Sequence, residues 1–179
     1  ESVALDLREA RDRSRLVGLL RQADIVVESA RARGLEQMGI CAADIVAARP
    51  GLTWLGISGY GRRAPQRDWI AYGDDAGVAA GLSWLLRRDS GELVFCADAI
   101  ADPLTGLHAA LLAWAAWRGG GGQLLDISLR GVTGFCCSGA TARARTPDVD
   151  VAMPQARPVT AAAAGLGADT ARVLREFAL

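Results

Sequence analysis

The sequence contains no lysine, and all twenty members of its Lys-plus-Arg count are arginine. A Schiff-base lysine, a lysine that anchors pyridoxal phosphate and the lysine of a phosphate-binding P-loop are therefore excluded. Histidine occurs once, as His108, which excludes a multi-histidine metal site and leaves one possible imidazole base. We therefore expect no metal and no permanently bound cofactor.

A surplus of charge is also absent, because twenty acidic residues balance the twenty arginines. Nucleic-acid binding usually requires a basic surplus, so no nucleic-acid partner is expected. No apolar stretch is long enough to span a bilayer, and no basic-then-apolar signal segment opens the sequence. These features predict a cytoplasmic protein without a membrane partner. The cysteines lack Cys-x-x-Cys spacing and are expected to be free, buried side chains in a reducing compartment: Cys41, Cys96, Cys136 and Cys137.

What the sequence does contain is an alternation of apolar runs and helical patterns. With 179 residues and 51% hydrophobic content, the chain can bury one full core. Strands are predicted at 24–28, 52–58, 93–96 and 124–128, and helices at 7–22 (capped by Asp6), 35–38, 42–48, 76–86, 103–117 and within 165–179, with a surface turn at 87–91. This order predicts an α/β, Rossmann-like layered fold with a largely parallel sheet.

The stretch around Asp102 organises the rest of the prediction. After the apolar run 93–96, the chain turns at Asp102-Pro103 into a long apolar helix whose first turn is fixed by the proline. Asp102 is therefore predicted at the helix N-cap, where backbone N–H groups and the helix dipole favour an ionised carboxylate. Such a carboxylate suits a nucleophile that is deprotonated at neutral pH. It equally suits a structural cap, which is the commoner role, and the local sequence leaves both open.

Several segments, in this order and spacing, resemble the class III CoA-transferases of the CaiB/BaiF type, which include formyl-CoA transferase and, as a relative, alpha-methylacyl-CoA racemase. The resemblance rests on Ala-Asp-Ile-Val-Val-Glu (23–28), Gly-Leu-Glu-Gln-Met-Gly-Ile (34–40), Gly-Ile-Ser-Gly-Tyr-Gly (56–61), Ile-Ala-Tyr (70–72), Ala-Asp-Pro-Leu-Thr-Gly-Leu-His-Ala (101–109), Gly-Gln-Leu-Leu-Asp-Ile-Ser-Leu (122–129) and Gly-Leu-Gly-Ala-Asp-Thr-Ala-Arg-Val-Leu (165–174). From the first to the last, this ordered set spans residues 23–174, roughly four fifths of the chain.

The resemblance implies that Asp102 is the catalytic nucleophile. The family motif Asp-x-x-x-Gly-x-His stands here as Asp102, Gly106 and His108. Its implied mechanism is attack by the aspartate on an acyl-CoA thioester, through aspartyl-anhydride and aspartyl-CoA intermediates, with CoA as a substrate and a carboxylic acid as acceptor. Gly106 is expected to keep the surface beside the nucleophile open for substrate. His108 is expected to pack or to hydrogen-bond rather than to act as a base.

Tyr72 aligns with a family tyrosine close to the nucleophile, where the racemase branch carries histidine. The tyrosine favours a transferase over a racemase, although without the resemblance it reads equally well as a half-buried aromatic at a helix start. Gly59 and Gly61 follow the strand 52–58, at the edge where α/β sheets bind ligands, and are candidate CoA-binding positions.

Two further positions concern the CoA phosphates. Arg31 is retained from the family's Asn-Phe-Arg-Pro segment and is expected to contact the nucleotide end of CoA. Gln37 stands where the family usually has an arginine that helps to bind the phosphates, and an amide supplies neither that charge nor a bidentate fork.

The resemblance also sets the expected domain organisation. Residues 1–138 correspond to a partial large domain, 139–164 to an irregular arm or linker, and 165–179 to a C-terminal helix that docks on the large domain. The family's small domain and a preceding segment that contributes to the CoA site are expected to be missing. Because family dimers are interlocked, a homodimer or a partner subunit is expected. The alternative function is a non-catalytic or assembly subunit, or a fragment, of such a transferase; an acyl-CoA racemase is less favoured.

Overall fold

The structure of the protein is a computed structural model that describes residues 1–30, 32–139, 152–153 and 155–179. Contacts within the chain divide it into two compact units. Residues 20–139 form one unit, and residues 1–19 together with 140–179 form the other. The first unit contains the sheet and all candidate site residues.

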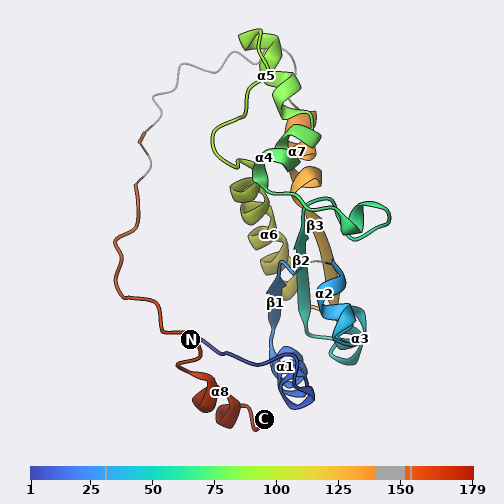
Figure 1. Ribbon diagram of the computed structural model, residues 1–179, viewed down its shortest axis with the longest axis vertical. Helices are drawn as coiled ribbons and strands as arrows, with labels where there is room; N and C mark the ends of the chain where they lie inside the picture. Colours follow the sequence, from blue (N-terminus) through green and yellow to red (C-terminus); the bar gives the residue numbers. More distant parts are fainter. Residues whose placement is uncertain (31, 140–151, 154) are drawn as a thin grey trace. The chain divides into compact units, whose positions relative to one another are not determined.

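A three-stranded parallel sheet lies at the centre of the 20–139 unit, in the order β1 (Ile25–Glu28), β2 (Thr53–Ser58), β3 (Gln123–Ser128) (Figure 1). Leu55 and Ile127 pack with small helical residues in one buried cluster, and Trp54, which the strand directs to the other face, is also fully buried. A central parallel strand covered on both faces needs no polar alternation, which is why the run 52–58 is mostly apolar. The predicted α/β fold with a largely parallel sheet is confirmed.

Helices surround the sheet: α2 (Ala32–Gln37), α3 (Ala42–Ala48), α4 (Gly73–Ala79), α5 (Leu82–Ser90), α6 (Ala101–Arg118) and α7 (Leu129–Ser138), with a short 3-10 turn, η1 (Gln66–Asp68). The long helix α6 runs beside the strands (Figure 1) and contacts β2 and β3. Its buried positions recur every four residues, at Ala101, Thr105, Ala109 and Ala113, so small side chains allow close packing against the sheet.

Two predictions about residues 76–96 are wrong. The expected helix 76–86 is two helices, because Gly81 between them adopts a left-handed φ of +91°, and α5 continues through the expected turn to Ser90. The expected buried strand 93–96 pairs with no strand among the described residues, and Leu93 and Phe95 are 66% and 64% exposed. A short apolar run indicates burial only when another element covers it.

Helix α7 was not predicted. It follows β3 directly, and the Ser128 hydroxyl accepts a hydrogen bond from the Gly131 N–H at 3.1 Å, which caps its first turn. Leu129 and Thr133 are buried, whereas Cys136 is exposed. All four cysteines are free, as predicted, but none is buried, so that part of the prediction is wrong.

The second unit joins the two terminal parts of the sequence. The Ser2 N–H donates to the Asp169 carboxylate at 2.8 Å, and the Ala4 N–H donates to the Thr170 hydroxyl at 2.9 Å. Both partners lie at the start of α8 (Thr170–Glu176), the helix predicted within 165–179. Half of the expected arm 139–164 lies outside the described residues, and residues 152–153 and 155–164 contain no helix or strand.

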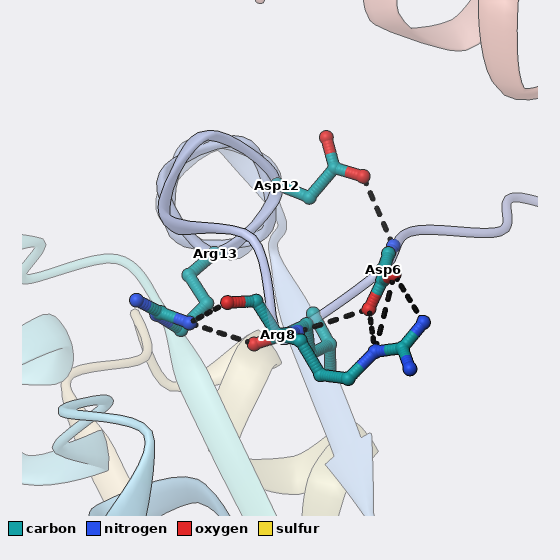
Figure 2. A network of polar contacts seen from close by, with 5 residues as sticks. Asp6, Arg8, Asp12 and Arg13 are labelled. Atoms are coloured by element: carbon teal, nitrogen blue, oxygen red, sulfur yellow. Dashed lines mark hydrogen bonds and ion pairs between the residues drawn. The ribbon is translucent and has the colours of Figure 1, made fainter.

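Asp6 does not cap α1 (Ala10–Gln22), which begins four residues later. Its carboxylate instead accepts hydrogen bonds from the Arg8 N–H at 3.0 Å and the Arg8 Nε at 2.9 Å, forming a tight turn ahead of the helix (Figure 2). The Arg8 guanidinium is the main reason that the pKa of Asp6 lies below its ordinary value. The prediction of an N-cap at Asp6 is therefore wrong.

The terminal unit should loosen in acid through Asp169. Hydrogen bonds from the Ser2 N–H and the Arg172 guanidinium lower the pKa of Asp169 from its ordinary 3.8. The carboxylate therefore stabilises the folded form above pH 3.8, and this contribution is lost as the pH falls further, through the folded-state pKa. At pH values below 3.8, we expect the Ser2 and Ala4 amides to be less protected from hydrogen exchange. The Asp169→Asn variant should lack this pH-dependent loss of protection. Protection that is independent of pH would contradict this account.

Candidate functional site

A pocket of about 470 Å³ lies at the carboxyl ends of β1 and β2. Three segments line it: Ser29 and Ala30 with the α2 residues Arg33, Gly34 and Gln37; residues 57–61, at the end of β2; and residues 67–72, which begin within η1. Gly59, Gly61, Tyr72 and Gln37 are all among the lining residues. The structure thus brings these sequence-predicted positions together at the sheet edge where α/β proteins bind ligands.

Gly59 and Gly61 shape this pocket through the backbone. A Cβ at position 59 would lie 2.5 Å from the Cβ of Ala71, so only glycine lets the two pocket walls approach this closely. Gly61 has a left-handed φ of +93°, and its N–H donates to the Ser58 hydroxyl at 3.0 Å.

A row of residues across the three strands holds the pocket walls in place. Glu28, Gly56 and Asp126 are register partners on β1, β2 and β3. The Arg62 guanidinium pairs with Glu28, and the Arg62 N–H donates to Asp126 at 3.0 Å. A Cβ at Gly56 would lie 2.8 Å from two guanidinium nitrogens, so the glycine makes room for Arg62 across the central strand. The loop after β2 is thereby tied to both outer strands.

Asp102 lies in the first turn of α6 but is not its N-cap. The helix begins at Ala101, which is fully buried against Ala76 and Leu129, and this anchor fixes the position of the next residue. Asp102 is exposed, and its carboxylate has no hydrogen-bond or ion-pair partner within the part of the chain that the structure describes. The N-cap of α6 is Ile100, so the prediction of Asp102 is wrong by two residues. The error arises because proline fits the first turn of a helix at more than one position. Within the described residues, the Asp102 carboxylate therefore makes no capping hydrogen bond.

The start of α4 connects the pocket to the turn before Asp102. Tyr72 lines the pocket and is the N-cap of α4; its side chain is 76% exposed rather than half-buried. Two residues later, the Asp74 carboxylate accepts a hydrogen bond from the Ala99 N–H at 2.9 Å. Gly73 also abuts this turn, since a Cβ there would lie 2.5 Å from the Ala99 carbonyl oxygen. Asp102 itself is not among the residues that line the pocket.

The turn itself is strained. Ala97 and Ala99 have positive φ values of 55° and 48°, a left-handed conformation that costs a non-glycine residue about 1–2 kcal/mol. The contacts from α4 offset this cost and fix where α6 begins. Strained, over-determined backbone of this kind is frequent at functional sites.

Gly106 and His108 occupy different surroundings on α6. Gly106 is exposed one helical turn after Asp102, and a Cβ there would meet no atom within 4 Å. The His108 Nδ1 lies 2.8 Å from the Leu104 carbonyl oxygen, and the ring packs edge-to-face on Phe135 at 6.0 Å. His108 therefore has the packing and hydrogen-bonding role that the sequence indicated. Arg31 lies outside the described residues.

Four charged side chains around the pocket were not predicted from the sequence. Arg33 pairs with Asp68 at 2.6 Å, and Arg67 pairs with Glu36 at 2.6 Å, so both pairs join α2 to η1. Arg33 precedes Gln37 by four residues, and this spacing was the only local signal that the two share a helix face.

The described residues contain no group of three or more His, Cys, Asp or Glu side chains that could hold a metal ion. Within the same residues, no helix has both the length and the apolar character needed to cross a bilayer.

The sequence profile of CoA-transferase family III matches residues 1–170. The chain belongs to this family. It is similar to an acyl-CoA transferase of Fusarium pseudograminearum, with 32% identity over 132 residues, which cover 72% of this chain and 29% of that protein. It is also similar to a succinyl-CoA–D-citramalate CoA-transferase of Chloroflexus aurantiacus, with 29% identity over 133 residues, 72% of this chain and 33% of that one.

Solved structures agree with the assignment to CoA-transferase family III. A CaiB/BaiF family protein from Brucella suis superposes with a TM-score of 0.67 and 25% identity, covering 77% of this chain and 38% of that protein. The chain thus spans about a third of the length of the curated relatives it matches.

Proposed function

We propose that the chain forms part of a CoA-transferase that moves CoA between an acyl-CoA thioester and a carboxylic acid, with Asp102 as the nucleophile. The observation that carries this proposal is the Asp102 carboxylate, which is exposed in the first turn of α6 and has no structural partner among the described residues. A carboxylate that neither caps the helix nor pairs with a cation has its oxygens free to attack a substrate. The pocket, which α4 links to the turn before Asp102, and the membership in family III supply the context.

In the proposed reaction, a carboxylate oxygen of Asp102 attacks the thioester carbonyl carbon, which forms a mixed anhydride and releases CoA as a thiolate. The thiolate then attacks the aspartyl carbonyl, which gives an aspartyl-CoA thioester and frees the donor acid. The acceptor carboxylate attacks this thioester to form a second anhydride and releases the thiolate again. Attack of the thiolate on the acceptor's acyl carbon completes the new acyl-CoA and restores Asp102.

The surrounding residues fit this chemistry. The positive end of the α6 dipole favours a negative charge at Asp102. The pocket formed by Gly59, Gly61 and Tyr72 is proposed to hold CoA as a substrate, and no other cofactor is needed. Gly106 leaves the surface beside the nucleophile open. Tyr72 offers no imidazole for proton transfer at a substrate α-carbon, which favours a transferase over a racemase.

We also propose that the protein acts as a homodimer or with a partner subunit. Leu107, Leu111 and Trp114 lie on one face of α6 and are 70%, 62% and 57% exposed, which is unusual for apolar side chains on a helix that packs against a sheet. A non-catalytic or assembly subunit could also use this exposed apolar surface to bind a partner. That role, however, gives no function to the Asp102 carboxylate.

Hydroxylamine distinguishes these alternatives, because it traps an activated carboxyl group but does not react with a free carboxylate. We expect hydroxylamine to inactivate the intact protein only when an acyl-CoA is present. Protein treated with hydroxylamine and free CoA is the matched control and should keep its activity. Inactivation without acyl-CoA, or no inactivation at all, would count against the transferase.

A further inference from the structure

We propose that Arg33 and Arg67 bind the phosphate groups at the nucleotide end of the CoA thioester, and that Arg33 supplies the charge that Gln37 lacks. This inference rests on the proposed function, because it names the phosphate-binding residues of the same pocket.

Arg33 is placed for this role by the geometry of α2. It lies one helical turn before Gln37, and both residues line the pocket. Among the described residues its one partner is Asp68, which accepts from the Nε at 2.6 Å. The two terminal guanidinium nitrogens therefore stay available as a fork for phosphate oxygens. Its side chain is 55% exposed, so a ligand in the pocket can reach it.

Arg67 approaches the same pocket from η1. One of its terminal nitrogens donates to Glu36 at 2.6 Å, while its Nε is buried and has no hydrogen-bond acceptor among the described residues. The nearest carboxylate oxygen assigned to the Nε belongs to Asp68, 4.0 Å away, too far for a hydrogen bond. The buried Nε cannot itself reach a ligand, but the second terminal nitrogen of Arg67 has no partner among the described residues and is the donor that a phosphate would engage.

The remaining pocket residues indicate a nucleotide rather than a simple organic acid. Tyr60 and Trp69 both line the pocket and pack edge-to-face, with ring centroids 5.5 Å apart. Trp69 is 56% exposed, so one large aromatic surface is available for a base to stack upon. Two arginines with unused donors beside an exposed indole match phosphate groups attached to adenine.

The arginine pairs with Asp68 and Glu36 hold the cations in place before ligand binds. This predicts opposite effects for the two members of the Arg33–Asp68 pair. Arg33→Gln removes a phosphate donor. Asp68→Asn removes a negative charge that repels phosphate, while the amide oxygen can still accept the hydrogen bond from the Arg33 Nε that positions the guanidinium. A purely structural ion pair would be damaged equally by either substitution.

The test is calorimetric binding of CoA, dephospho-CoA and pantetheine to the intact protein and its variants. We expect Arg33→Gln and Arg67→Gln each to weaken CoA binding about tenfold, the lower end of the range for a charge-assisted hydrogen bond. Asp68→Asn should bind CoA at least as tightly as the unaltered protein. Pantetheine, which carries no phosphate, should bind all variants equally. Arg88→Gln, on the exposed surface of α5 and outside the pocket, is the matched control and should leave the affinity unchanged.

The outcomes separate this inference from the proposed function. If Arg33→Gln binds CoA normally, or if Asp68→Asn weakens binding as much, the inference is overturned, while acyl-CoA-dependent hydroxylamine inactivation would still support the transferase. Absence of CoA binding by the unaltered protein would overturn both. A defect of Arg33→Gln that persists with dephospho-CoA assigns Arg33 to the pyrophosphate, and a defect seen only with CoA assigns it to the 3′-phosphate; either result supports the proposal.

Discussion

Replacing Asp102 with asparagine should reduce CoA transfer by at least about a thousandfold, because the neutral amide is isosteric with the carboxylate but cannot form the anhydride. Binding of CoA thioesters should change by less than about twofold, since Asp102 does not line the pocket. Thermal stability should also be preserved, because the carboxylate has no partner in the described structure to lose. Steady-state kinetics, calorimetry and a thermal melt of the same preparation measure all three.

Asp98→Asn is the matched control for this substitution. Asp98 is an exposed aspartate in the turn that precedes α6, and no hydrogen bond or ion pair is assigned to it among the described residues. The control should retain full activity. Equal losses in the two variants would show that the rate depends on negative charge near the turn and not on a nucleophile at Asp102.

Gly73→Ala should destabilise the 20–139 unit by about 3 kcal/mol, the upper part of the range for overpacking. The new Cβ would lie 2.5 Å from the Ala99 carbonyl oxygen and 2.8 Å from the carbonyl carbon. These are backbone atoms of a turn already strained at Ala99, so they cannot move aside as a flexible side chain would. Chemical denaturation followed by tryptophan fluorescence measures the loss.

Gly106→Ala is the control for Gly73→Ala, because it makes the same chemical change at a position where space is free. No atom lies within 4 Å of a Cβ at position 106, and alanine is favoured over glycine in an exposed helix by about 1 kcal/mol. This variant should therefore be more stable than the unaltered protein. If Gly73→Ala were as stable as Gly106→Ala, the proposed dependence of the Asp102 turn on α4 would be incorrect.

Local patterns in the sequence were sufficient to locate the three strands of the sheet. The runs that became β1, β2 and β3 are largely apolar and bounded by helical patterns, and this local signal placed each of them. The run 93–96 has the same local character but lies exposed, because no strand among the described residues pairs with it. Burial of such a run depends on tertiary neighbours, which local sequence does not encode.

The candidate site likewise contains residues that the sequence pointed to and residues that only the folded structure brings together. Gly59 and Gly61 follow the predicted strand 52–58 and Tyr72 was singled out by the family resemblance; the pocket brings the three together, and their role in CoA binding stays a prediction. The row Glu28, Gly56 and Asp126 was not predictable, because it exists only once the strand order and register are known. The Arg33–Asp68 pair was missed for the same reason, since 35 residues separate its members.

The most direct test of the central claim is to locate the group that hydroxylamine traps. The intact protein, incubated with an acyl-CoA and hydroxylamine, should carry a hydroxamate on the carboxyl group of Asp102 and nowhere else in α6 or the preceding turn, as read by peptide mass spectrometry. The Asp98→Asn variant should be labelled normally, and the Asp102→Asn variant should not be labelled. A hydroxamate on another carboxyl group, or labelling of Asp102 without acyl-CoA, would contradict the assignment of Asp102 as the nucleophile.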